Sequence, residues 1–190
     1  MSSQILDRIR RNHALEHATI NVLSQKFKGF SAQGNSTPGG FNLNIYGDIE
    51  RESVIAAVDE AYDRLQKGES KLALHPNCGT VLLTTATMAA VAAQATLSLE
   101  RRRQNHPTYN LPMLIAALPL TILAIFVAII VSKPVGMTVQ EKYTVDPDLG
   151  DLKVVNVRPV TPFIATRIFQ LLLGQAKNDD VNAYRIDTVG

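Results

Sequence analysis

The chain has 190 residues, a formal net charge of +2 and a single cysteine. One cysteine excludes an internal disulfide, and this charge with 6% aromatic residues gives no basis for nucleic-acid binding. Hydrophobic residues make up 46% of the chain but are unevenly spread, which predicts parts of different character along it.

Residues 4–28 are predicted to form an amphipathic helix. Apolar residues recur at about 100° per residue and make one stripe. They are Ile5, Ile9, Ile20, Leu23 and Phe27. Gly29 is typical of the position after a helix end.

This helix carries the most informative motif, His13-Ala14-Leu15-Glu16-His17. Positions i and i+4 share a helix face, so His13 and His17 can bind one metal ion, and Glu16 projects to the same side. Two histidine ligands with a carboxylate as general base are the set that metal-assisted hydrolysis requires. Glu16 also falls on the apolar stripe, where a carboxylate is costly unless it is paired. The alternative is a closed hydrogen-bonded cluster that only fixes packing.

The rest of residues 1–79 is predicted to be a small α/β unit of two helices and three strands. A short strand over 30–33 and a turn cluster over 35–40 lead to an alternating strand over 41–46. A second helix runs from about 50 to 67, and residues 71–74 are predicted to be a short strand.

A second motif, His75-Pro76-Asn77-Cys78-Gly79, follows that strand and is predicted to form a turn. His75 is the better candidate for a third ligand, and Cys78 as a fourth would close the site around a structural metal. The metal predicted from these residue types is zinc. The alternative is that His75 and Cys78 shape a tight entry into the next segment, with an inert buried thiol. His106 lies in a polar loop and is predicted to be solvated.

Residues 80–132 are predicted to form a transmembrane helical hairpin. Neither 80–99 nor 111–131 contains a charged residue, and each is long enough to cross a bilayer of about 30 Å. Partners are therefore the lipid bilayer and, as an alternative, another membrane protein. The Arg101–Arg103 run favours a cytoplasmic link. Flanking lysines and the lack of an apolar leader favour cytoplasmic ends, which is the orientation we expect.

Residues 133–190 are predicted to be a C-terminal extramembrane α+β part. Residues 139–145, 153–160 and 181–189 are expected to be strands. Thr161-Pro162 is predicted to open an apolar helix that runs through Leu173. The whole chain is therefore expected to be α+β, with a membrane hairpin between two extramembrane parts.

The two motifs, the Thr37–Phe41 turn and the two spans together resemble a family of uncharacterised bacterial membrane proteins from cyanobacteria and green non-sulfur bacteria. This resemblance implies an inner or thylakoid membrane but no established activity. The pentapeptide alone is similar to that of inverzincin peptidases. That likeness implies zinc ligands at His13 and His17 and a base at Glu16. Those enzymes are much larger and use a glutamate as third ligand, which His75 would have to replace here.

Two functions remain open at this point. The first is a membrane-anchored zinc protein, with metal-dependent, peptidase-like hydrolysis by Glu16 as its catalytic form. The second is a non-enzymatic membrane assembly or interaction subunit with a structural metal site or a buried His–Glu cluster. Four protein ligands would favour the second, because three ligands and a water leave the metal open to substrate.

Overall fold

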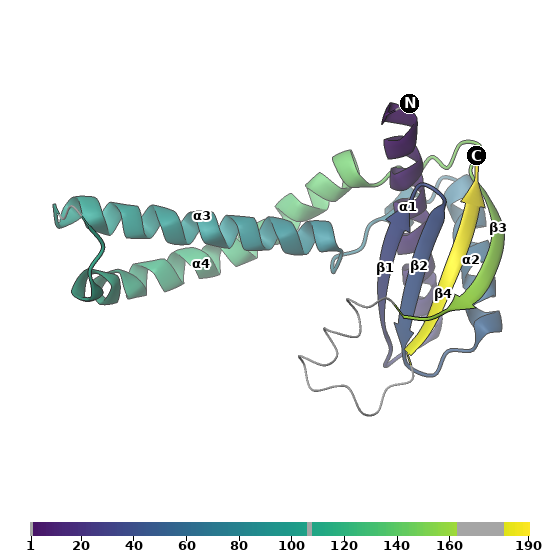
Figure 1. Cartoon of the computed structure of the whole chain (residues 1–190), viewed down its shortest axis with the longest axis horizontal. Coiled ribbons are helices and arrows are strands. Elements are labelled where there is room, and N and C mark those ends of the chain that lie inside the picture. Colours follow the sequence, from purple (N-terminus) through teal and green to yellow (C-terminus); the bar gives the residue numbers. More distant parts are fainter. Residues whose placement is uncertain (1, 106–107, 163–180) are drawn as a thin grey trace. The chain divides into compact units, whose positions relative to one another are not determined.

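A computed structural model describes residues 2–105, 108–162 and 181–190 (Figure 1). The chain divides into two compact units, Met1–His75 with Tyr143–Gly190, and Pro76–Lys142. The two segments that flank the hairpin, treated above as separate parts, therefore belong to one unit. His106 and residues 163–173 of the expected C-terminal helix lie outside the described residues.

The first unit is a four-stranded antiparallel sheet with helices, which confirms the α+β class. The described strands have the order β1-β2-β4-β3. The elements are α1 (Ser2–Lys26), β1 (Ser31–Thr37), β2 (Gly40–Tyr46), α2 (Arg51–Gln66), the 3-10 turn η1 (Ser70–Ala73), β3 (Lys153–Val160) and β4 (Val181–Val189).

The core lies between one face of this sheet and helices α1 and α2 (Figure 1). Alternation along β2 buries Phe41, Leu43 and Ile45 completely, as the sequence predicts. Phe41 is paired with Ile186 of β4, so a C-terminal strand completes the sheet that the N-terminal hairpin begins. The expected strands 153–160 and 181–189 are confirmed with these bounds.

The predicted strand over residues 71–74 is wrong, because this segment forms the 3-10 turn η1 and the extended residue that follows it. Its carbonyl groups are satisfied by helix α1 instead of by a neighbouring strand. Asn21 Nδ2 donates to the carbonyls of Leu72 (2.8 Å) and Leu74 (3.0 Å). The third strand of the expected N-terminal unit is thus replaced by strands from the C-terminal segment.

The second unit is a hairpin of α3 (Gly79–Arg103) and α4 (Leu111–Val139), followed by a π-helical turn, η2 (Gln140–Thr144). The predicted strand over 139–145 is therefore wrong, since helical hydrogen bonding continues through most of it. Hydroxyl pairs link the two helices, with Thr96 2.9 Å from Thr121 and Thr85 2.7 Å from Ser132. Close packing is aided by Gly136, where an added Cβ would stand 3.0 Å from the Val81 Cα.

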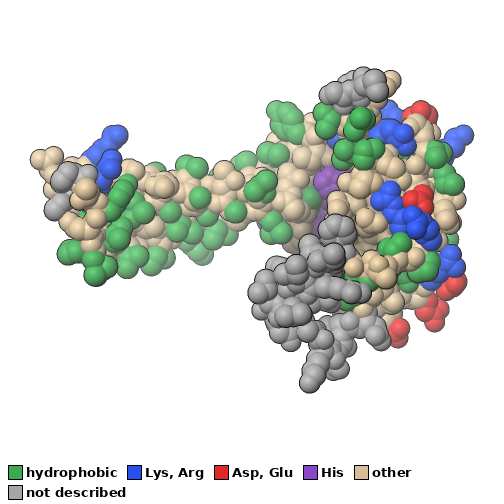
Figure 2. All heavy atoms as spheres, viewed as in Figure 1, with side chains coloured by type: hydrophobic (Ala, Val, Ile, Leu, Met, Phe, Trp, Pro, Cys, Tyr) green, Lys and Arg blue, Asp and Glu red, His purple; other side chains and the backbone are tan. Residues whose placement is uncertain are grey.

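Both hairpin helices are long and apolar enough to cross a membrane. In the most apolar 18-residue stretch of each helix, only 6% of α3 and 17% of α4 is buried, so their apolar side chains lie mainly on the surface. Figure 2 shows hydrophobic side chains along the hairpin with Lys and Arg at its tip, whereas charged side chains gather on the α+β unit. A core helix of a soluble protein would instead bury most of this apolar surface.

Candidate metal centre

Helix α1 places His13 and His17 side by side. They are one turn apart, and their ring centroids are 4.3 Å apart with the planes tilted by 59°. His17 is buried, with 2% of its surface exposed, and His13 is partly buried. Two imidazoles are therefore held next to each other at the edge of the core.

Backbone carbonyl groups fix the orientation of both rings. His13 Nδ1 lies 2.9 Å from the Thr144 carbonyl oxygen, and His17 Nδ1 lies 2.8 Å from that of Ala73. A carbonyl oxygen only accepts, so this bonding assigns the proton to Nδ1 in each ring. Each neutral ring then carries its lone pair on Nε2, which is the arrangement typical of histidine ligands to a metal.

The carbonyl partners come from segments far away in the sequence. Asn21 holds the carbonyls of Leu72 and Leu74, on either side of the one that His17 contacts. A sequence pattern gives no direct sign of such backbone partners, so they could not be predicted from the residues. The two misassigned strands are the segments that supply these carbonyls, which is why helix spacing alone could not complete the site.

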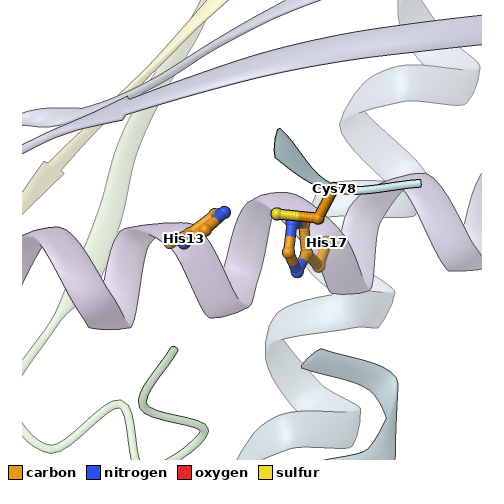
Figure 3. A group of neighbouring side chains, drawn as sticks. All are labelled: His13, His17 and Cys78. Atoms are coloured by element: carbon orange, nitrogen blue, oxygen red, sulfur yellow. The ribbon is translucent and has the colours of Figure 1, made fainter. Parts of the chain in front are cut away.

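The second motif also approaches His17. The His75 ring centroid is 5.8 Å from that of His17, and Cys78 follows His75 by three residues. One ligand atom from each of His13, His17 and Cys78 lies within 4.8 Å of the others (Figure 3). Imidazole nitrogen and thiolate sulfur are donor types that zinc takes in proteins.

Cys78 is buried and caps the N-terminus of α3, where its Sγ accepts a hydrogen bond from the Thr80 amide at 3.5 Å. The positive end of a helix dipole favours an anionic thiolate, which is the form that binds zinc. Among the described residues, the compact group of donors is His13, His17 and Cys78, and it includes neither His75 nor Glu16.

Glu16 faces strand β1. Its side chain is buried, with 4% of the residue exposed, and Ser36 Oγ donates to its Oε2 at 2.6 Å. Gly34 makes room for the carboxylate, because an added Cβ there would overlap Glu16 Oε1. Neither partner was predicted from the sequence, although a glycine inside a strand often marks a close approach.

A hydrogen-bond network ties the segment beside His13 to the sheet. Asn12 is fully buried, donates to the Thr37 carbonyl at 2.9 Å and accepts from Thr188 Oγ1 at 2.8 Å. Arg11 reaches Asp151 at 2.9 Å, and the Asp146 amide donates to the Arg10 carbonyl at 3.1 Å. These contacts hold the 144–151 loop, and with it the carbonyl partner of His13, against α1.

The chain belongs to the family described as a domain of unknown function (DUF6391), whose match covers residues 8–157. It is also similar to an uncharacterized protein of Picosynechococcus sp. (strain ATCC 27264 / PCC 7002 / PR-6), with 40% identity over 98 residues. That alignment covers 45% of this chain and 47% of the relative, so the match spans about half of each protein. No solved structure matches the chain.

Proposed function

We propose that this protein is a membrane-anchored zinc-binding protein in which His13, His17 and Cys78 are ligands. The observation that carries the proposal is the pair of Nδ1–carbonyl hydrogen bonds on His13 and His17. In both adjacent histidines Nε2 is the ring nitrogen that would bind a metal. This arrangement is typical of metal ligands, and two histidines that only fill space would not require it.

The donor set is the reason for choosing zinc. In proteins, zinc is bound in tetrahedral geometry by ligands such as histidine nitrogen and thiolate sulfur, whereas calcium and magnesium prefer oxygen ligands. His75, next to His17, is the candidate for a fourth ligand. Four protein ligands would make the site structural, and it would then stabilise the fold directly.

Membrane anchoring is supported by the exposed apolar hairpin and by the way in which the α+β unit is assembled from two segments of the chain. That unit is built from segments on both sides of the hairpin. Two crossings return the chain to the side from which it started, so both segments can join one sheet. We assign this side to the cytoplasm, and the membrane to a bacterial inner or thylakoid membrane. Extraction of membranes with alkaline carbonate should therefore leave the protein in the membrane pellet.

Metal content of the purified full-length protein tests the zinc proposal. Elemental mass spectrometry should find about one zinc per chain in the wild type. The variant His13→Ala with His17→Ala should contain almost none, whereas His106→Ala, a matched histidine change, should retain it. No zinc in wild-type protein purified without chelator would overturn the proposal, as would zinc that remains in the double variant.

Variants of the second motif separate the two kinds of site. If Cys78→Ser and His75→Ala each lower zinc content or affinity strongly, the site has four protein ligands and is structural. If only Cys78→Ser does so, three ligands hold the metal and one position is open.

Hydrolysis with Glu16 as general base is the second candidate function. It is favoured by a buried carboxylate one residue from His17. The Ser36 hydrogen bond and the Gly34 contact instead favour a role for Glu16 in positioning α1 on the sheet. Glu16→Gln should therefore retain zinc, and it should abolish peptide or ester hydrolysis only if Glu16 acts as the base.

A further inference from the structure

A groove on the α+β unit has none of the proposed zinc ligands in its lining. It is formed by the last turns of α1, the end of α2 and the η1 segment, and its volume is about 770 Å³. This volume is in the range of small-molecule sites. Asn21 joins two of the walls by donating hydrogen bonds to the Leu72 and Leu74 carbonyls.

The groove is cationic. Its lining includes Lys28, Arg64 and Lys71 against the single acid Glu69. Within the described ranges 2–105, 108–162 and 181–190, neither Lys28 nor Lys71 forms an ion pair. Two lysines in one concave site without acidic partners favour an anionic ligand.

Arg64, in the same lining, is held in place by hydrogen bonds. It donates to Glu69 at 2.8 and 3.0 Å and to Gln25 at 2.9 Å. The hydrogen bond to Glu69 raises the pKa of Arg64, which keeps the guanidinium charged. Arg64 already has carboxylate partners, and Lys28 Nζ donates to the Ser24 carbonyl at 3.4 Å. An ammonium group has three donors, so both lysines still have donors to offer a phosphate.

The position of the groove in the chain indicates where the anion comes from. Leu74 lines the groove, and only residues 75–78 separate it from Gly79, where α3 begins. Four residues extend over at most about 14 Å. If α3 enters the bilayer near Gly79, the groove can reach the level of the lipid headgroups, where basic side chains attract anionic lipids.

We propose that this groove binds the phosphate of an anionic phospholipid headgroup through Lys28 and Lys71. The inference rests on the proposed membrane anchoring and adds to it a lipid class and two binding residues. Leu72 and Leu74 are also part of the groove lining, and Leu74, the less buried of the two, offers apolar contact to the lipid.

Native mass spectrometry of the full-length protein in neutral detergent tests this. Phosphatidylglycerol, phosphatidylcholine and inorganic phosphate are added in separate titrations. Phosphatidylglycerol should bind well below the concentration at which the other two do. Lys28→Gln with Lys71→Gln should weaken it about 10-fold or more, whereas Lys142→Gln with Lys153→Gln, an equal charge change outside the groove, should have little effect.

Three results would overturn the inference. They are equal binding of phosphatidylcholine, equal weakening in both lysine pairs, and inorganic phosphate that binds as tightly as the lipid, which would indicate a soluble ligand. Carbonate extraction of the same samples keeps the two proposals apart. Wild-type protein that stays in the membrane but shows no lysine-dependent lipid binding contradicts only this inference, whereas extraction of the wild type contradicts membrane anchoring itself.

Discussion

The two units satisfy buried polar groups in the same way but present opposite surfaces. In the α+β unit, the buried Asn12, Glu16 and His17 each have a hydrogen-bond partner at a distant position in the chain. In the hairpin, the buried Thr96 and Thr121 hydroxyls pair with each other. The exposed side chains are mainly polar or charged in the first unit and mainly large and apolar on α4. The units therefore differ in the character of the surface that they expose.

This difference predicts that one substitution has different effects in the two units. Phe41 is fully buried between β2 and the helices, while Phe126 on α4 is 60% exposed. Phe41→Ala should lower the free energy of unfolding of the α+β unit by about 3–5 kcal/mol. Phe126→Ala should change it by less than about 0.5 kcal/mol. Thermal denaturation followed by near-UV circular dichroism in detergent measures both, and equal losses would show that α4 packs in a protein core.

An introduced charge should have the opposite pattern of effects, with a large effect in the hairpin and a small one in the α+β unit. Leu123 on α4 and Val155 on β3 are similarly exposed, at 58% and 61%. Arginine at the centre of a membrane helix costs about 2.5–3.5 kcal/mol, whereas it is tolerated at a position facing water. Leu123→Arg should therefore reduce the carbonate-resistant fraction strongly and Val155→Arg should not. Unchanged membrane retention of both variants would contradict a lipid-facing α4.

The smallest expected effect concerns Asp187 on strand β4, which forms ion pairs with Arg158 and Arg185. Burial alone would raise the pKa of Asp187, but hydrogen bonds from Arg158 and Arg185, both at 3.0 Å, outweigh it and hold that pKa below its usual value. A lowered native pKa stabilises the fold above the unfolded pKa of about 3.9, and this stabilisation is lost as the pH falls through the native pKa.

Asp187→Asn should therefore lower the stability at pH 7 by about 0.2–1 kcal/mol, with a difference from wild type that shrinks below about pH 4. Melting temperatures of both proteins across this range measure it. Asp59→Asn, at an exposed position on α2, is the matched control. A difference that persists unchanged at pH 3 would mean that the carboxylate charge is not the cause.

Local patterns predicted the elements that have strong periodicity. The helix with His13 and His17, the alternation along β2 and the two long apolar helices all follow from residue spacing. The strands 153–160 and 181–189 were also predicted correctly, because β-branched residues are frequent in both. The pairing of β4 with β2 could not be predicted, since it depends on contacts across more than half of the chain.

The errors occurred where tertiary contacts decide the backbone. Residues 71–74 lack a strand neighbour because Asn21 and His17 bind their carbonyls. Residues 139–144 stay helical as a continuation of α4. For the candidate site, helix spacing predicted that His13 and His17 are neighbours, but the carbonyls of Ala73 and Thr144 and the Ser36 partner of Glu16 required the folded structure.

The position of β4 in the sheet has a consequence for the order of events during synthesis. β4 lies between β2 and β3, yet it is the last of these strands to leave the ribosome. The edge of β2 that pairs with β4 therefore stays without this partner until residues 47–180, which include the whole hairpin, have been synthesised. An unpaired strand edge is prone to pairing with other chains. Insertion of the hairpin would hold the early segment at the membrane during this interval, so the sheet would close only after the hairpin is in place.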